Sequence, residues 1–487
     1  MIFNSVTYLL FLSLAICLFW TLPTRPRLWM IFLSGLAFYG FWRPEFLAVI
    51  LLSVVTDYVV AQRIEATENE KKRKLWLLSS LTVNLGLLFY FKYLYFFVDN
   101  AIVVMHFFDI EVQSPVLNIV LPLGISFYTF QTISYTVDVY RKFIPAERNF
   151  VLYGCFVTFF PQLVAGPILR ASELLHQLSA KPCFRLDTFV SGLRRILFGL
   201  FLKVVLADNI SPLVDTGFQQ PVSSMSAIDV WTLAFLFGFQ IYYDFSAYSH
   251  IAIGSARLMG ISFPENFNFP YMASSPREFW RRWHISLSSW IRDYLYLPLL
   301  GVKVQDRSAG GLATATQDHG KAIHHPVLTL FFTWAIMGFW HGANWTFIMW
   351  GLYHAVLVVA YRIVSVRTVA LPILVRKWGG WAVTLPLVML AWVPFRAETV
   401  GSALEMFAKL VSPGEYIYLG MRENTYLVAV VVFLASFLAY IFHERVSKWF
   451  GEKLLISFVL EAVLMSVVIA MVFVFLRPIS QFIYFQF

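Results

Sequence analysis

The sequence predicts an all-α, polytopic membrane protein. Hydrophobic residues make up 59% of its 487 residues and charged residues only 13%, whereas soluble domains average about 45–50% and about 25%. Aromatic residues reach 18%, which fits a bilayer with Trp and Tyr at both interfaces. Apolar stretches long enough to cross about 30 Å of hydrocarbon recur along the whole chain. We therefore interpret residues 1–487 as one transmembrane unit rather than several soluble domains.

Eleven apolar segments are predicted to be membrane helices. They lie near residues 5–23, 28–42, 44–61, 75–98, 188–207, 227–260, 326–342, 344–366, 379–395, 424–444 and 455–476. Two more segments, 116–140 and 150–169, are interrupted by Pro122, Gly124, Pro161, Gly166 and Pro167. Irregular backbone at membrane depth is tolerated only where protein or a water-filled cavity satisfies its polar groups. These two segments are expected to be re-entrant, beside roughly 11 spans.

A basic loop from Arg63 to Lys74 predicts the orientation. The positive-inside rule places such a loop in the cytoplasm, and counting back three spans places the N-terminus outside. The first apolar run, which ends at Trp20, lacks a basic n-region and a small-residue cleavage pattern, so we expect an uncleaved helix. The net charge of +9 is interpreted as loop asymmetry. The expected partner is the lipid bilayer and not nucleic acid.

Several kinds of chemistry are disfavoured by missing motifs. Cys17, Cys155 and Cys183 are widely spaced, so neither a zinc site nor a disulfide framework is predicted. The sequence has no Gly-x-Ser-x-Gly elbow, Gly-rich phosphate loop or His-Glu-x-x-His motif. No bound metal or cofactor is expected. The polar loop near residues 301–325 is expected to be mobile.

The segment from Pro276 to Leu297 predicts a helix lying in the membrane interface. On a helical projection Trp280, Trp283 and Leu287 share an apolar face, and the arginines lie outside it. His284 lies at the edge of the apolar face, from which its side chain can turn toward the protein interior. The alternative is an interfacial anchor with an incidental histidine.

The apolar run from Val327 to Tyr361 must break, because as one helix it would be about 50 Å long. Gly342 and Asn344 mark the expected break, which places His341 at a helix discontinuity. An ionisable residue at membrane depth is by default a functional-site hypothesis. The alternative is a histidine that caps a helix end or hydrogen-bonds a neighbouring carbonyl. His354, further along the run, is expected to be structural.

Two histidines on separate elements suit O-acyl transfer. A neutral imidazole, with a pKa of about 6.5, can accept the proton of a hydroxyl near neutral pH. His341 and His284 are therefore the candidate catalytic residues, each following a tryptophan in the sequence. Candidate supporting or substrate-lining residues are Asn344, Asp244, Trp283, Arg282 and Trp340.

Charges in the apolar segments leave alternatives open. Asp244 lies in the middle of an apolar segment and is costly unless it is paired or faces water. Arg195 and Lys203 lie within about 80° of each other on one predicted helix, and Arg194 points away. The two cations could neutralise the phosphates of a thioester donor or pair with Asp244. Snorkelling toward the interface is the favoured interpretation.

Six motifs along the chain are distinctive. They are PLGISFYTFQ from Pro122, PQLVAGP from Pro161, YYDFSAYS from Tyr242, ENFNFPY from Glu265, EFWRRWHISLSSWIRDYLY from Glu278 and GFWHGANWT from Gly338. Together they resemble the membrane-bound O-acyltransferases, and most closely their bacterial branch with the alginate O-acetyltransferase membrane subunit and the D-alanyl-teichoic acid transferase. The resemblance covers nearly the whole chain, including FIYFQF from Phe482.

The resemblance implies a ring of tilted helices around a central tunnel, with core motifs in residues 116–360 and peripheral helices in 1–100 and 379–476. The near-invariant histidine of the family maps onto His341, and the second recurrent histidine onto His284. We expect His341 to activate the acceptor hydroxyl, and His284 to orient the donor or stabilise the developing oxyanion. The implied reaction passes an acyl group, here acetyl, from a cytoplasmic thioester such as acetyl-CoA or an acyl carrier to an extracytoplasmic polysaccharide such as alginate. A periplasmic acetyltransferase partner, polysaccharide synthesis machinery and the bacterial inner membrane are implied as well.

Two departures leave the acceptor open. His250 stands where the alginate branch commonly has Asp, and Gly301 to Val304 replaces a Gly-Gly-Asn-Arg run. Another exopolysaccharide, a small molecule or a lipid-linked acceptor is therefore an alternative to alginate. A rival hypothesis from another class is a transporter or polysaccharide-export channel whose histidines couple to protons. It lacks support from paired halves with matching interruptions.

Overall fold

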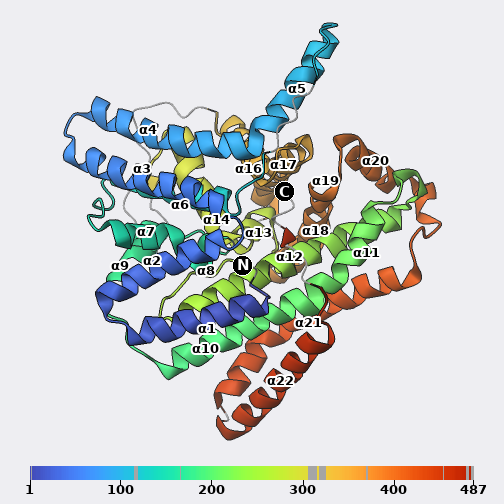
Figure 1. Cartoon of the computed structure of the whole chain (residues 1–487). Coiled ribbons are helices and arrows are strands. Elements are labelled where there is room, and N and C mark those ends of the chain that lie inside the picture. Colours follow the sequence, from blue (N-terminus) through green and yellow to red (C-terminus); the bar gives the residue numbers. More distant parts are fainter. Residues whose placement is uncertain are drawn as a thin grey trace.

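The N-terminal apolar segments form long helices. The computed structural model describes residues 1, 3–113, 119–164, 166–304, 315–316, 325–368, 371–452, 454–478 and 482–483. Its first helices are α1 (Val6–Thr21), α2 (Thr24–Gly40), α3 (Leu47–Ala66), α4 (Glu70–Leu88) and α5 (Leu94–Phe107). A 3₁₀ turn at Pro44–Phe46 precedes α3, and a π-helical turn at Phe89–Tyr93 joins α4 to α5. α5 has no buried residue and projects away from the other helices (Figure 1).

The two segments with predicted breaks are irregular at the expected places. They form α6 (Ile125–Tyr140), α7 (Phe150–Thr158) and α8 (Phe160–Leu163), and α9 (Ala171–Ser179) follows. Gly124 precedes α6 in the left-handed conformation, with φ 71°. A Cβ at this glycine would lie 2.4 Å from the carbonyl oxygen of Leu163, so the two broken segments meet here. The predicted interruptions at Gly124 and near Pro161 are confirmed.

A long buried helix, α12 (Ala227–Leu258), runs through the body of the protein. It is preceded by α10 (Leu186–Leu200), a π-helical turn at Phe201–Ala207, α11 (Asp208–Phe218) and a 3₁₀ turn at Val222–Ser224. α12 packs along α10 and also contacts α8, α11 and α18 to α21. Figure 1 shows α10, α11 and α12 running together across the molecule. Helices from the middle and from the end of the chain are therefore assembled on α12.

The remaining elements complete the helical fold. They are a 3₁₀ turn at Pro270–Met272, α13 (Pro276–Arg282), α14 (Ile285–Ile291), a π-helical turn at Arg292–Tyr296, α15 (Leu297–Leu299), α16 (Pro326–His341), α17 (Trp345–Thr368), α18 (Ile373–Leu390), α19 (Trp392–Arg396), α20 (Val400–Leu410), a 3₁₀ turn at Pro413–Tyr416, α21 (Glu423–Glu452) and α22 (Leu454–Val474). Two short strands, β1 (Lys303–Val304) and β2 (Ala315–Thr316), pair antiparallel. Most of the loop predicted to be mobile, near 301–325, lies outside the described residues.

The structure confirms an all-α polytopic membrane protein. Within the described residues, six helices are long and apolar enough to cross a bilayer: Pro44–Ala66, Glu70–Phe107, Leu186–Phe218, Trp345–Val366, Ile373–Arg396 and Glu423–His443. Shorter apolar helices are Val6–Thr21, Pro326–His341 and Leu460–Val474. The figure of roughly 11 spans and the central tunnel stay predictions.

The prediction of one helix over residues 276–297 is wrong. The chain leaves the helix after Arg282 and resumes it at Ile285, so Trp283 and His284 form a joint between α13 and α14. The apolar face that suggested an interfacial helix is buried in protein instead: Phe279, Trp283 and Leu287 are all at most 1% exposed. Contacts within the fold, which periodicity does not encode, decide this break.

The snorkelling interpretation is wrong for Lys203. Its side chain is 2% exposed, and its ammonium forms ion pairs with Asp208 at 2.9 Å and Asp244 at 2.6 Å. Arg195 instead pairs with Glu265. Apolar surroundings make an unpaired charge costly, so Lys203 and Asp244 satisfy each other inside the protein.

A buried polar cluster joins α3, α4 and α6. Both carboxylate oxygens of Asp57 accept hydrogen bonds from the Asn84 amide, at 2.8 and 3.1 Å, and Ser80 also donates to Asp57. Thr132 and Thr136 of α6 extend the cluster through Asn84 and Ser80. Because each buried polar group needs a partner, this cluster fixes how the three helices sit against one another.

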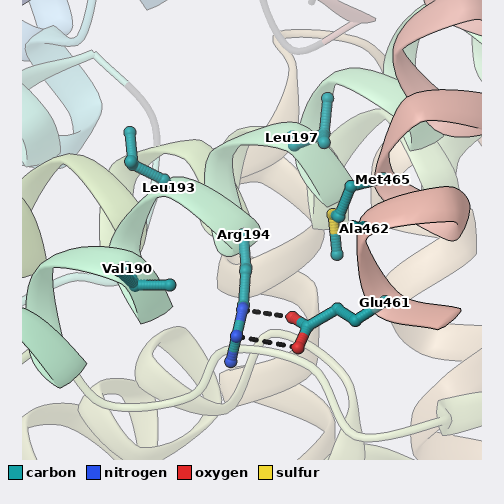
Figure 2. A pocket seen from close by; sticks show the side chains of 7 residues that line it. All are labelled: Val190, Leu193, Arg194, Leu197, Glu461, Ala462 and Met465. Carbon is teal, nitrogen blue, oxygen red and sulfur yellow. Dashed lines mark hydrogen bonds and ion pairs between the residues drawn. The ribbon is translucent and has the colours of Figure 1, made fainter. Parts of the chain in front are cut away.

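An ion pair ties α22 to α10. Arg194 of α10 pairs with Glu461 of α22 (Figure 2). The two side chains border a cavity of about 250 Å³ whose other lining residues are apolar, namely Val190, Leu193, Leu197, Ala462 and Met465. Within this apolar surface each charge depends on the other for its partner.

Replacing Glu461 by Leu is expected to lower stability by about 1–2 kcal/mol, because Arg194 loses its partner beside apolar residues. Arg194→Leu/Glu461→Leu is expected to recover most of this loss, because two apolar side chains need no pairing. The check is the thermal unfolding midpoint of wild type, both single variants and the double variant in one detergent. Equal midpoints for all four proteins would contradict the pairing argument.

Candidate active site

The joint between α13 and α14 presents His284. Ser275 begins α13 by accepting the backbone N–H of Glu278 at 3.1 Å, and α13 ends where Trp283 N–H donates to Phe279 at 2.8 Å. The carbonyl oxygen of His284 then starts α14 by accepting from Ser288 N–H at 3.0 Å. His284 itself adopts the left-handed conformation, with φ 40°. Such conformations cost energy in residues other than glycine and cluster at functional sites.

Asn266 orients the imidazole of His284. The ring nitrogen Nδ1 lies 3.1 Å from Asn266 Oδ1, which also accepts from Ser286 N–H at 3.3 Å and Ser286 Oγ at 2.9 Å. The Asn266 amide nitrogen donates to Ser249 at 3.1 Å. These bonds identify Oδ1 as an acceptor, so Nδ1 carries the proton. In a neutral ring, Nε2 then has a lone pair available for accepting a proton.

Nε2 of His284 is the chemically available atom of this residue. It is buried, and within the described part of the chain it has no hydrogen-bond partner. Around the ring lie Phe127, Phe245 and Phe267, with centroid distances of 6.5, 4.6 and 6.3 Å. An apolar enclosure excludes competing water and strengthens any polar contact a substrate makes.

His341 is the last residue of α16. The next residue, Gly342, is extended, and α17 begins at Trp345, so the predicted break is confirmed. The His341 side chain is 4% exposed. Its ring contacts Trp340, Trp350 and Phe395, at 4.9, 4.9 and 5.3 Å between centroids. His341 is therefore a buried imidazole at a helix end, and its catalytic role stays a prediction.

Glycines bring α16 and α17 close together beside His341. A Cβ at Gly338 would lie 2.2 Å from the carbonyl oxygen of Phe347, and one at Gly351 would lie 2.1 Å from that of Trp334. A Cβ at Gly342 would meet the Phe347 ring at 2.1 Å. The backbone can reverse direction this tightly only because these three positions lack side chains.

Stacked aromatic rings connect the two histidines. Phe130 of α6 lies between Trp290 of α14 and Trp340 of α16, with centroid distances of 3.9 and 5.1 Å. Trp290 Nε1 also donates to the Phe130 carbonyl oxygen at 2.9 Å. Phe127, one turn earlier on α6, contacts both His284 and Trp340. A predicted re-entrant segment thus separates and aligns the helices that carry the histidines.

The two predicted tryptophans belong to this interior. Trp283 is 1% exposed and contacts Trp392 at 4.9 Å and Phe267 at 5.1 Å between centroids. Trp340 is 5% exposed and stacks on Phe130. His354 is also buried, where its Nδ1 accepts from Trp280 at 3.4 Å. This contact agrees with the structural role expected for His354.

Arg282 and Asn344 make hydrogen bonds with groups other than the two imidazoles. Arg282 donates to Glu278 at 2.7 and 2.9 Å and to the Asn268 carbonyl oxygen at 3.1 Å. Burial would raise the pKa of Glu278, but hydrogen bonds from Ser274 and Arg282 outweigh it and the pKa is lowered. Asn344 is exposed and accepts from Thr346 N–H at 3.0 Å. Both side chains make hydrogen bonds with nearby residues of their own segments rather than with His284 or His341.

Asp244 is buried on α12, one residue before Phe245. Besides Lys203, it accepts the backbone N–H of Ile483 at 2.8 Å. Phe482 stacks on Tyr248 at 4.1 Å between centroids. The Lys203–Asp244 pair therefore holds a piece of the C-terminal segment against α12, close to the ring that contacts His284. The rest of the FIYFQF motif lies outside the described residues.

Sequence reasoning missed Asn266 and Lys92. Asn266 lies in the quoted ENFNFPY motif, but its pairing with a histidine 18 residues away carries no periodic signal. Lys92 donates to two backbone carbonyl oxygens at the end of α16. It is a lone cation in the apolar segment 75–98, so the cost of charge at membrane depth was a signal that could have identified it.

Known proteins are similar to this chain in sequence. The model of the membrane-bound O-acyltransferase family matches residues 145–316, which include His284. A probable alginate O-acetylase AlgI of Azotobacter vinelandii is 39% identical over 418 residues, covering 85% of this chain and 79% of that protein. The chain belongs to the membrane-bound O-acyltransferase family.

Two further relatives are similar to this membrane-bound O-acyltransferase over more than half of its length. A peptidoglycan O-acetyltransferase of Helicobacter pylori is 36% identical over 80% of this chain and 74% of its own. A teichoic acid D-alanyltransferase of Bacillus subtilis is 27% identical over 63% of this chain and 70% of its own. The resemblance inferred from the motifs is confirmed. The protein is a multi-pass membrane enzyme that transfers acyl groups, and the relatives do not support the transporter hypothesis.

Gly338→Ala is expected to destabilise the enzyme and reduce its acyl transfer at least 10-fold, because the new methyl group meets backbone that has no room to move. Gly86→Ala in α4 is the matched control, since a Cβ there has no neighbour within 4 Å. In this helical position Ala is expected to be neutral or slightly stabilising. Thermal unfolding and turnover of both variants test whether the enzyme needs the close contact of α16 and α17. Wild-type behaviour of Gly338→Ala would show that α16 and α17 do not need this contact.

Proposed function

We propose that this enzyme transfers an acetyl group from a cytoplasmic thioester to a hydroxyl group of an extracytoplasmic polysaccharide, or to a partner protein that completes the transfer. Support comes from relatives named for O-acetylation of alginate and of peptidoglycan, which are hydroxyl-bearing carbohydrate polymers. Two buried imidazoles in an apolar interior suit this chemistry. Acetyl-CoA and an acyl carrier protein are both compatible donors.

The observation that carries the proposal is the fixed orientation of His284. Its Nδ1–H is used by Asn266, so Nε2 presents a lone pair. This arrangement suits acceptance of a hydroxyl proton rather than donation to an oxyanion. We therefore reverse the roles expected from sequence: His284 is the general base, and His341 donates a hydrogen bond to the thioester carbonyl oxygen as it gains negative charge.

The proposed reaction proceeds by addition to the thioester and collapse of the tetrahedral intermediate. The acceptor oxygen forms a bond to the thioester carbonyl carbon while Nε2 of His284 takes the hydroxyl proton. The tetrahedral intermediate collapses, the carbon–sulfur bond breaks, and the leaving thiolate takes that proton from the imidazolium. One ester and one thiol are formed, and His284 returns to its neutral state. Phe127, Phe245 and Phe267 would limit hydrolysis by keeping water from the thioester.

Paired substitutions distinguish the two roles in acyl transfer by the purified enzyme. His284→Asn, chosen because Asn tolerates φ above zero, is expected to lose about 10²–10⁴-fold of turnover. His341→Ala is expected to lose about 10²–10³-fold, and His341→Gln less than that, because its amide can still donate. If His341→Gln is as inactive as His341→Ala while His284→Asn remains active, His341 is the base, as the sequence analysis expects.

Asn266→Leu is expected to lower turnover on the order of 10²-fold, because Nδ1 of His284 loses its acceptor and the ring loses its fixed tautomer. The matched control is Asn268→Leu, which changes an exposed asparagine two residues away in the same loop. Donor KM and the unfolding midpoint are measured with turnover. Equal turnover of the two variants would remove Asn266 from the site.

The proposed setting is a bacterial inner membrane, with residues 1–487 as one transmembrane unit and the N-terminus in the periplasm. Support comes from the basic loop Arg63–Lys74, which fits the cytoplasm, and from the bacterial sources of the relatives. A periplasmic acetyltransferase partner and polysaccharide synthesis machinery would receive the acetyl group.

A further inference from the structure

We propose that Lys92 is a positioning residue for His341, whose ammonium group holds the carbonyl end of α16 and so fixes the place of the imidazole. This inference rests on the role proposed above for His341. Lys92 touches the backbone of the histidine and of the tryptophan before it. It is therefore placed to act through His341 rather than on substrate.

The contacts are specific. Lys92 Nζ donates to the carbonyl oxygen of Trp340 at 2.6 Å and to that of His341 at 3.0 Å. The ammonium also lies 5.7 Å from the centroid of the Trp340 ring, within the range of a cation–π interaction. All three contacts converge on the last two residues of α16, from a helix about 250 residues earlier in the chain.

The end of α16 needs such a partner. The last carbonyl groups of a helix lack intrahelical donors and carry a partial negative charge. α16 ends in an extended Gly342 among buried Trp340, Trp350 and Phe395, where water is scarce. A lysine ammonium supplies both hydrogen-bond donors and a compensating charge. The ammonium is itself partly buried in an apolar segment, which is costly unless its protons are used, so the two groups are mutually dependent.

The helix that carries Lys92 is shaped for this contact. Lys92 lies in the π-helical turn Phe89–Tyr93 that joins α4 and α5, beside α16 (Figure 1). A π turn includes one extra residue and shifts later side chains by about 100° around the helix. Tyr93 stacks on Phe339 at 4.4 Å between centroids. This turn therefore packs against the residues that end α16 through two successive side chains.

Loss of this anchor should affect chemistry more than binding. Trp340 and His341 would keep their identities, but their backbone would no longer be fixed relative to the turn between α4 and α5. A misplacement of about 1 Å at a reacting group can cost 10²-fold in rate. The donor would still bind through contacts elsewhere.

The test compares Lys92→Met with Lys92→Arg in acyl transfer by the purified full-length enzyme with acetyl-CoA. Lys92→Met is expected to reduce kcat about 10–100-fold, with KM for acetyl-CoA changed by less than about threefold. Lys92→Arg, which keeps the charge and hydrogen-bond donors on a larger group, is expected to recover kcat to within about threefold of wild type. Tyr90→Leu is the matched control, since Tyr90 lies in the same turn, is 51% exposed and should leave kcat unchanged.

Several outcomes would overturn the inference. Wild-type kcat for Lys92→Met would do so, as would a loss in kcat that Lys92→Arg does not recover, or an equal loss in Tyr90→Leu. If Lys92→Met does not fold, Lys92→Gln replaces it, and the inference requires its kcat to be at least 10-fold below that of Lys92→Arg. His341→Ala is measured in parallel. Wild-type kcat there refutes the role of His341 itself, whereas an inactive His341→Ala beside a fully active Lys92→Met refutes only the role of Lys92.

Discussion

The pairing of buried charged and polar side chains from distant segments fixes how the helices of this protein pack. With charged residues at 13% of the chain, partners are scarce and each must be supplied by a specific residue elsewhere. Asp57 is satisfied by Asn84 and Ser80, and Lys203 by two aspartates. The same rule operates at the site, where Asn266 satisfies one nitrogen of His284 and leaves the other for chemistry. Nε2 of His284 is one of several buried polar atoms without a hydrogen-bond partner in the described residues, and its position beside Phe245 suits it for chemistry.

Both candidate histidines lie where regular helix stops. His284 forms the joint between α13 and α14, and His341 ends α16. An α-helix directs its side chains outward from a regular cylinder and gives little freedom in where they point. A joint allows the backbone to present an imidazole at an angle that no helical position offers. The cost is that each joint needs support from distant segments, which Asn266 and Lys92 provide.

The parts of the fold that could be predicted from sequence are those encoded locally. Hydrophobicity locates the helices, and Gly124 and Gly342 mark real interruptions because proline and glycine act on the backbone where they stand. The prediction of one helix over 276–297 is wrong, since its break depends on Asn266 accepting hydrogen bonds from His284, Ile285 and Ser286 at the joint. Lys203 was likewise misjudged, because a helical projection of its own segment does not show Asp244. Contacts between distant segments cannot be predicted from the local patterns of a single sequence.

The close approach of α16 and α17 changes how sequence constraint at this site should be interpreted. Gly338, Gly342 and Gly351 have no side chains that could participate in chemistry, yet a single added carbon at any of them would overlap with neighbouring atoms. In a saturation mutagenesis scan these positions should tolerate as few residues as His341 itself. Intolerance beside the histidine is therefore a measure of packing as much as of catalysis. Gly342 follows His341 in the GFWHGANWT motif because a residue without a side chain leaves space for the Phe347 ring.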